Sequence, residues 1–277
     1  MEKENLYLKK DDVKFSYTGK WVNGELSDAG ELETNNYTMH FTDFDRIGYY
    51  LGETESGIPS GQGKFTATNS DGEDYTYTGE FKNGIFHGQG SRVFDESGEH
   101  YTEIGTFING DFSPDLIGGI NAYGSRDSFK FVIADETAEF INSNLQYIEG
   151  DGFEFADIEA LVDRDVSYGD YIKQPSKYLS KMVCWENYTI IQIQIYDFYD
   201  KDQECIEIIA QDNNNHVICS YGFLQKNTES DKTWIDFLNE GAELDFYGIP
   251  ISSTSFENVA GGNTNCVVML TVFYDIH

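Results

Sequence analysis

The chain has 277 residues, of which 49 are Asp or Glu and 18 are Lys or Arg, so its formal net charge is −31. Residues 1–125 carry 9 basic and 22 acidic side chains, and residues 126–277 carry 9 and 27. Neither half therefore has the basic surface that binds nucleic acid phosphates. With 39% apolar residues, the chain can form two ordinary cores rather than a disordered acidic tail.

The composition favours strands joined by tight turns. Glycine is frequent at 27 residues and proline is rare at 4, while Phe and Tyr number 20 and 19. Aromatic residues are enriched in strands and glycine in turns, so we expect a mainly β protein.

The sequence shows no membrane or targeting signal. Its first twelve residues are rich in charge, and it has no run of about 18 apolar residues. As the sequence stands we expect a cytoplasmic protein. An extracellular or envelope-anchored location is the alternative if a leader has been removed.

The N-terminal part contains an internal repeat, which is clearest at residues 77–90, YTGEFKNGIFHGQG. Tyr77, Gly79 and Phe81 alternate onto one face of a strand. Asn83 and Gly84 predict a type I′ turn, which needs positive φ at both central residues. The segment is therefore a predicted β-hairpin.

Three further copies share these offsets. Two of them are marked by Tyr17, Gly19, Trp21 and Gly24, and by Tyr50, Gly52, Gly57, Gly61 and Gly63. The last copy keeps Gly105, Phe107 and Gly110 but has Glu103 in place of the tyrosine, which is typical of a terminal cap.

The pattern YxGxFxxGxxxGxG is similar to MORN repeats, and the resemblance covers residues 17–116. It implies hairpins stacked into an elongated antiparallel sheet. Asp28 and Thr54 depart from the pattern, where a glycine and an aromatic residue are expected. Anchor glycines at 19, 52, 79 and 105 are widely spaced, which predicts enlarged connections, of which residues 34–47 form the largest.

The repeated aromatic residues have two interpretations. As a cross-strand ladder they would hold the sheet together. Alternatively, part of the ladder stays open as a groove for a peptide or protein. The candidate binding residues on this sheet are Tyr17, Trp21, Tyr50, Tyr77, Phe81 and Phe107.

Short helices are predicted after the repeats. Residues 135–147 have apolar positions near a 3.6-residue period and an acidic start. A second helix is expected over residues 155–164, and a third before Pro175. The predicted organisation is a repeat sheet at 1–120, a helical connector at 121–168 and a further domain at 169–277.

From Met182 onward the sequence has a strand pattern broken by Asn, Asp and Gly clusters. Five strands with one helical insert at residues 231–238 predict a small OB-like barrel. Trp185 and Tyr188 are its candidate binding residues. The segments around residues 170–181 and 240–262 resemble an OB-like family of Gram-positive envelope proteins and lipoproteins, over residues 165–277.

No catalytic set emerges from the sequence, because no GxSxG element and no spaced Cys and His partners occur. The four cysteines lie outside any CxxC pair and are expected to fill strand cores. We expect no cofactor. The acidic run lacks the central glycine and distal Glu of an EF-hand, so it is only a weak metal candidate: Asp197, Asp200, Asp202 and Glu204.

These observations predict a non-enzymatic scaffold that uses the repeat sheet and the barrel as binding surfaces for a protein partner. A surface this acidic is repelled by nucleic acid, and by anionic membranes unless cations bridge the two. The alternatives are an envelope-associated module that binds a small ligand or lies near lipid, and a hydrolase.

Overall fold

The computed structural model forms two compact units, residues 1–127 and residues 128–277. It describes residues 4–10, 12–23, 25–68, 72–96, 98–126, 130–148, 154–198, 203–225, 238–257 and 261–277. The protein is mainly β, as the composition predicted.

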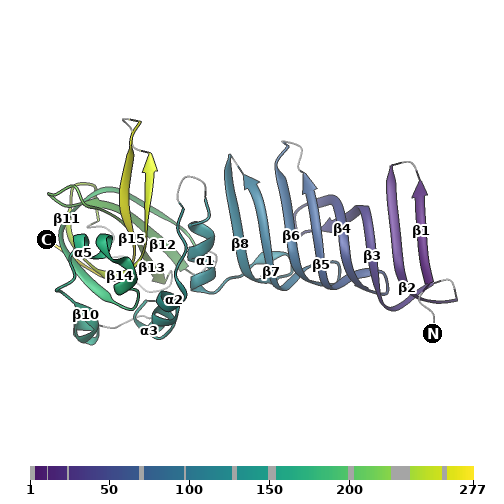
Figure 1. Ribbon diagram of the computed structural model, residues 1–277, viewed down its shortest axis with the longest axis horizontal. Helices are drawn as coiled ribbons and strands as arrows, with labels where there is room; N and C mark the ends of the chain where they lie inside the picture. The colour runs from purple at the N-terminus through teal and green to yellow at the C-terminus, as the bar shows by residue number, and fades with distance from the viewer. Residues whose placement is uncertain are drawn as a thin grey trace. The chain divides into compact units, whose positions relative to one another are not determined.

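The first unit is a single nine-stranded antiparallel sheet in which the strands follow one another in chain order (Figure 1). This is the arrangement that stacked hairpins predict. The strands are β1 (Glu4–Lys10), β2 (Val13–Val22), β3 (Glu25–His40), β4 (Asp45–Glu55), β5 (Ile58–Thr68), β6 (Asp74–Lys82), β7 (Ile85–Glu96), β8 (Glu99–Ile108) and β9 (Asp111–Phe112).

The predicted type I′ turn is present between β6 and β7, where Asn83 and Gly84 have φ angles of 54° and 86°. The turn before β9 repeats this geometry, with Asn109 at 52° and Gly110 at 95°. Both turns reverse the chain within two residues, because Asn and Gly tolerate positive φ.

A row of glycines crosses the sheet from β4 to β8. Each glycine pairs with the next on the neighbouring strand: Gly52, Gly63, Gly79, Gly90 and Gly105. A Cβ atom added at Gly52 would lie 2.4 Å from the Gly63 Cα, and one added at Gly79 would lie 2.4 Å from the Gly90 Cα. A larger residue cannot occupy position 52 or 79 without moving the backbone.

The rings of the repeat tyrosines occupy the space that the glycines leave. A Cβ atom at Gly90 would lie 2.3 Å from the Tyr77 hydroxyl, and one at Gly63 would lie 2.8 Å from the Tyr50 hydroxyl. Both hydroxyl groups donate to a backbone carbonyl three residues later, at 2.7 Å for Tyr50 and 2.8 Å for Tyr77. The two repeats therefore have the same internal contacts, 27 residues apart.

Aromatic rings fill one face of this sheet and pack against one another. Tyr77 stacks on Phe86 with ring centroids 3.8 Å apart, and Phe107 meets Tyr77 edge-on at 5.0 Å. Such pairs add to the free energy gained by burial. The fully buried rings of the ladder are Tyr17, Tyr50, Phe65, Tyr77, Phe86 and Phe107.

The last repeat replaces an aromatic pair by an ion pair. Phe65 pairs with Tyr77 across the junction of β5 and β6, and the corresponding pair between β7 and β8 is Arg92 with Glu103. The Arg92 Nε donates to a Glu103 carboxylate oxygen, and their side chains are 18% and 5% exposed. The Arg92 guanidinium lies 5.4 Å from the centre of the Phe107 ring, so the ladder continues through a cation–π contact.

Helix α1 (Leu116–Tyr123) follows β9, in place of a further hairpin. Asp115 caps it by accepting the Gly118 N–H at 2.8 Å. The sequence predicted a terminal cap here but not a helix. Pro114 and Leu116 cannot make the glycine turn of the other repeats, so the chain leaves the sheet at this point.

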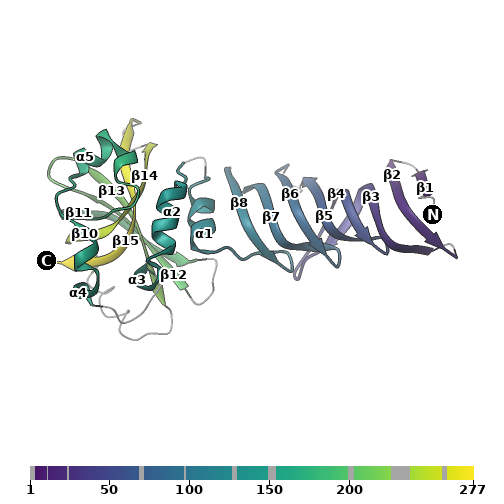
Figure 2. The same cartoon turned by 60° about the horizontal axis from the view of Figure 1, so that its bottom comes forward.

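The second unit contains a five-stranded closed barrel (Figure 2). Its strand order is β11, β12, β13, β15, β14, and β14 pairs back with β11, which closes the predicted five-stranded barrel. The strands are β11 (Met182–Asp197), β12 (Gln203–Gln211), β13 (Val217–Gln225), β14 (Glu243–Glu257) and β15 (Asn263–Ile276), and the short β10 (Val162–Asp163) runs parallel to β11. The insert predicted over residues 231–238 lies outside the described residues except for Leu238, which is buried.

The helices before the barrel are shorter than predicted. Residues 135–147 form two helices, α2 (Asp135–Asn142) and α3 (Leu145–Ile148), because α2 ends where the Asn144 side chain bonds back to the Phe140 carbonyl at 2.8 Å. The helix expected over 155–164 stops at α4 (Phe155–Ile158) and a 3-10 turn at residues 159–161, because Val162 joins strand β10. The third is α5 (Tyr168–Lys173), which Ser167 caps.

Replacing Gly52 by alanine tests the glycine row. We expect the variant to lose about 1–3 kcal/mol of stability, because the new methyl group meets backbone atoms that cannot rotate away. Thr78→Ala, on the exposed side of β6, is the control and is expected to stay within about 0.5 kcal/mol. Denaturant unfolding of the full chain measures both. Equal effects would show that the glycine row is not under steric constraint.

Replacing Glu103 by glutamine tests the ion pair. Burial raises the pKa of the Glu103 carboxyl, and the hydrogen bond and charge of Arg92 act to lower it. In the glutamine variant, the largely buried Arg92 guanidinium loses its counter-charge. We expect a loss of about 3–5 kcal/mol. The double variant Arg92→Phe, Glu103→Tyr rebuilds the aromatic pair of the preceding repeat and is expected to regain most of that stability. Failure of the double variant to do so would contradict the equivalence of the two pairs.

Candidate functional site

The long hairpin of β3 and β4 extends over the aromatic face. The Tyr37 hydroxyl donates to the Gly84 carbonyl at 2.9 Å, although the two residues are 47 positions apart. Beyond it, the Phe41 ring lies 5.7 Å from the Phe86 ring, and a Cβ atom at Gly110 would lie 3.1 Å from Phe41. The enlarged connection that the sequence predicted at residues 34–47 thus covers part of the ladder instead of projecting away from the sheet.

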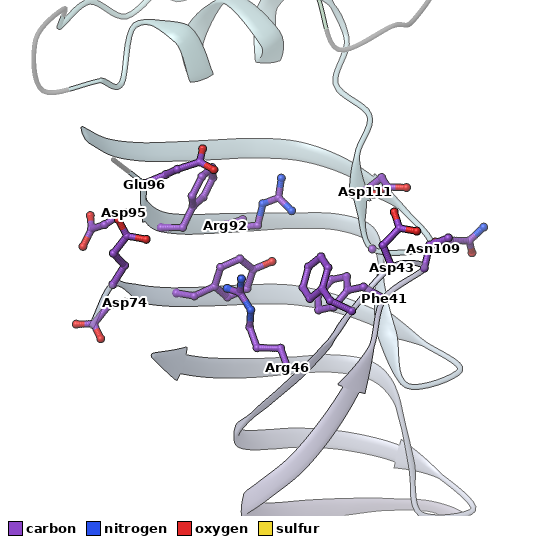
Figure 3. A pocket seen from close by; sticks show the side chains of 15 residues that line it. Phe41, Asp43, Arg46, Asp74, Arg92, Asp95, Glu96, Asn109 and Asp111 are labelled. Carbon is purple, nitrogen blue, oxygen red and sulfur yellow. The ribbon is translucent and has the colours of Figure 1, made fainter. Parts of the chain in front are cut away.

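A cavity of about 280 Å³ remains between the hairpin tip, strands β6 and β7, and residues 109–111 at the start of β9 (Figure 3). We call it the hairpin pocket. It is lined by Phe41, Thr42, Asp43, Phe44, Arg46, Glu73, Asp74, Tyr75, Arg92, Phe94, Asp95, Glu96, Asn109, Gly110 and Asp111.

Aromatic rings and two arginines form the middle of the hairpin pocket. Arg46 lies over the Tyr75 ring at 4.1 Å and near the Phe44 ring at 5.5 Å. Its guanidinium makes no ion pair or hydrogen bond with any residue in the described part of the chain. Arg92 is held by Glu103, so Arg46 is the arginine of the pocket whose donors are available.

Carboxylates gather at the margins of the hairpin pocket. Asp95 accepts from the His100 ring at 2.6 Å, and Asp74 accepts from the Thr68 hydroxyl at 2.8 Å. Within the described ranges, the carboxylates of Asp43, Glu96 and Asp111 have no side-chain partner. The pocket therefore presents a negative field around an aromatic and cationic centre.

The structure buries the aromatic residues that the sequence nominated for binding. Tyr17, Tyr50, Tyr77 and Phe107 have 0% exposure and Phe81 has 3%, so their rings hold the sheet together. For Trp21 only the backbone is described, in β2 opposite Leu26. The predicted groove along these rings is not open, because neighbouring rings and the β3–β4 hairpin cover them.

Trp185 and Tyr188 are buried in the core of the barrel, at 4% and 2% exposure. The Trp185 indole donates to the Val166 carbonyl at 2.9 Å. Both residues line a second cavity of about 430 Å³, beside Tyr168, which stacks on His216 at 4.5 Å. They are therefore part of a cavity wall and not of an exposed stacking platform.

The barrel cavity also contains a cysteine and an arginine. Arg164 donates to Glu186 at 3.0 Å and to the Cys184 sulfur at 3.5 Å. Burial raises the pKa of the Cys184 thiol to about 11. At neutral pH this thiol is protonated and is a poor nucleophile. All four cysteines are buried, and none of them forms a disulfide bond.

The weak metal candidates lie at the open end of β11 and β12. Asp197 pairs with Glu204 in the strand register, whereas Asp200 and Asp202 lie outside the described residues. In the described ranges, no three His, Cys, Asp or Glu side chains gather in a way that could hold a metal ion. None of the helices there is both long and apolar enough to cross a membrane.

The residues that form the hairpin pocket are not among those predicted from the sequence. Two signals could have pointed to them. Arginine occurs only at positions 46, 92, 126 and 164, and two of these four line the pocket. In addition, Arg92 and Glu103 both occupy repeat positions that are aromatic in the preceding copy. The two charged residues therefore replace an aromatic pair together.

Two of these hairpins match a known family of repeats. The MORN repeat model matches residues 50–72 and 77–98. These are the second and third copies that the glycine spacing predicted, and they contain the two sets of equivalent tyrosine contacts. No curated protein and no solved structure matches the chain.

The MORN hairpins supply two walls of the hairpin pocket, because Tyr75, Arg92 and Phe94 lie on β6 and β7. The remaining walls come from residues 41–46, which precede the matched segments, and from residues 109–111, which follow them. The pocket is therefore made by the repeats together with an enlarged connection of this chain.

Removing the Phe41 ring tests whether it holds the hairpin down. In Phe41→Ala we expect amides 38–47 to exchange hydrogen about tenfold faster or more, which corresponds to about 1.4 kcal/mol of lost local stability. Ile47→Ala is the control, since that side chain is 59% exposed on the same hairpin. Unchanged exchange in Phe41→Ala would show that the hairpin is held by its other contacts.

Proposed function

We propose that the protein is a non-enzymatic scaffold that binds a protein partner through the first unit. MORN repeats generally serve as protein- or membrane-interaction modules, which supports an interaction role. The observation that carries the proposal is the hairpin pocket, which combines exposed aromatic surface, available donors on Arg46 and unpaired carboxylates. Sites of this mixed character are typical of recognition surfaces.

The charges of the first unit favour a protein over a membrane as the partner. The lining of the hairpin pocket contains six carboxylates and two arginines, and the sheet as a whole is acidic. An anionic lipid surface attracts basic segments and repels such a face. Binding to a membrane would therefore need bridging cations.

The second cavity supports a further candidate function, the binding of a small ligand by the barrel. Its size is within the range of ligand sites, and rings of Trp185, Tyr188 and Tyr168 line it. The resemblance to OB-like envelope proteins points to the same activity and to an envelope location. Burial raises the pKa of the Cys184 thiol, so this cysteine is unsuited to serve as a nucleophile in the cavity.

Photo-crosslinking in the source cells tests the protein-binding proposal. A photo-reactive amino acid replaces Phe44, which is 52% exposed at the rim of the hairpin pocket, in the full-length chain. We expect discrete crosslinked products, identified by mass spectrometry. The same amino acid at Ile172, which is 43% exposed on α5, is the control. Equal products at the two positions, or none at Phe44, would contradict the proposal.

A further inference from the structure

The two margins of the hairpin pocket carry separate groups of carboxylates. Figure 3 shows Asp74, Asp95 and Glu96 at one margin and Asp43 and Asp111 at the other, with Arg46 and Arg92 between them. The first group lies where β6 begins and β7 ends. In the second group, Asp43 lies on the hairpin tip and Asp111 is the first residue of β9.

The strand register sets the distance between the margins. Asp95 pairs with His100, and Asp111 pairs with Ile108 on the same strand, β8. Eight residues of strand correspond to at most ~26 Å at about 3.3 Å per residue. A bound segment with a long side chain at each end could span this distance with roughly four to seven residues between them.

The centre of the pocket suits the main chain of such a segment. The Phe41 and Phe44 rings stack on each other at 4.7 Å and present an apolar surface. Arg46 lies over the Tyr75 ring, 4.1 Å from its centre, and has N–H groups available for carbonyl oxygens. The aliphatic stems of lysine or arginine pack well on aromatic rings, and their charged ends would reach the carboxylates.

We propose that the hairpin pocket binds an extended basic segment of the partner protein, with a Lys or Arg at each end and uncharged residues between them. The proposal rests on the proposed function, because it names the chemistry of that partner. Charge complementarity carries it: Asp43 and Glu96 lie at opposite margins, and neither has a side-chain partner within the described residues.

Titration with fluorescent peptides tests the proposal on the full-length protein. The probe is a nine-residue peptide with two lysines at each end and five Ser or Gly residues between them. A peptide with glutamates in place of the lysines is the second probe. Since the whole protein carries a charge of −31, any basic peptide will be attracted to it weakly. The pocket variant and its control must therefore have the same net charge.

The pocket variant is Asp43→Asn, Glu96→Gln, which removes one carboxylate from each margin. The control variant is Glu31→Gln, Glu55→Gln, which removes two exposed charges of β3 and β4 outside the pocket lining. We expect the pocket variant to bind the lysine peptide three- to tenfold more weakly, in line with exposed ion pairs, and the control variant to stay within twofold of the wild type. Hydrogen exchange should show protection of residues 38–47 only with the lysine peptide.

Equal affinities of the two variants would overturn the proposal and leave only non-specific attraction to an acidic protein. Equal binding of the glutamate peptide, or stronger binding to anionic vesicles, would also overturn it. A crosslinked partner that is insensitive to Asp43→Asn, Glu96→Gln would disprove the basic segment but leave the proposed function intact. Absence of any partner would instead disprove the proposed function.

Discussion

The first unit depends on one steric constraint, the close approach of backbone and tyrosine rings at the glycine row. Because Gly63 and Gly90 lack Cβ atoms, the Tyr50 and Tyr77 rings can lie against the neighbouring strand and bond to a carbonyl three residues later. An isolated hairpin is marginally stable. Hydrophobic burial of ring after ring converts a series of hairpins into one sheet, and the same packing removes those rings from the surface.

The sheet ends where this repeat chemistry changes. At the last junction, Arg92 and Glu103 occupy the positions of a phenylalanine and a tyrosine, and their charges are kept together by burial and by the Phe107 ring. Loss of either partner of a buried ion pair lowers the stability of the fold, so each of these two charged residues requires the other. Arg92 also forms part of the hairpin pocket, which links the end of the ladder to the candidate site.

The function that we propose arises from the part of the first unit that departs most from a regular repeat. The β3–β4 hairpin covers rings that would otherwise be exposed, and it brings Asp43 and Arg46 opposite β7. The result is a smaller and more charged site than an open aromatic groove. Selectivity for basic segments would then come from carboxylates, while affinity would come from the rings.

The sequence by itself determined the hairpins, the turn at Asn83 and Gly84, and the five-stranded barrel, because glycine spacing and strand alternation are local signals. It also indicated that residues 34–47 were enlarged. Only the tertiary structure decided where that segment folds, that aromatic residues such as Tyr77 and Trp185 are buried, and that two arginines far apart in the chain line one pocket. These outcomes depend on contacts between residues far apart in the chain, such as Tyr37 with Gly84, which no local pattern encodes.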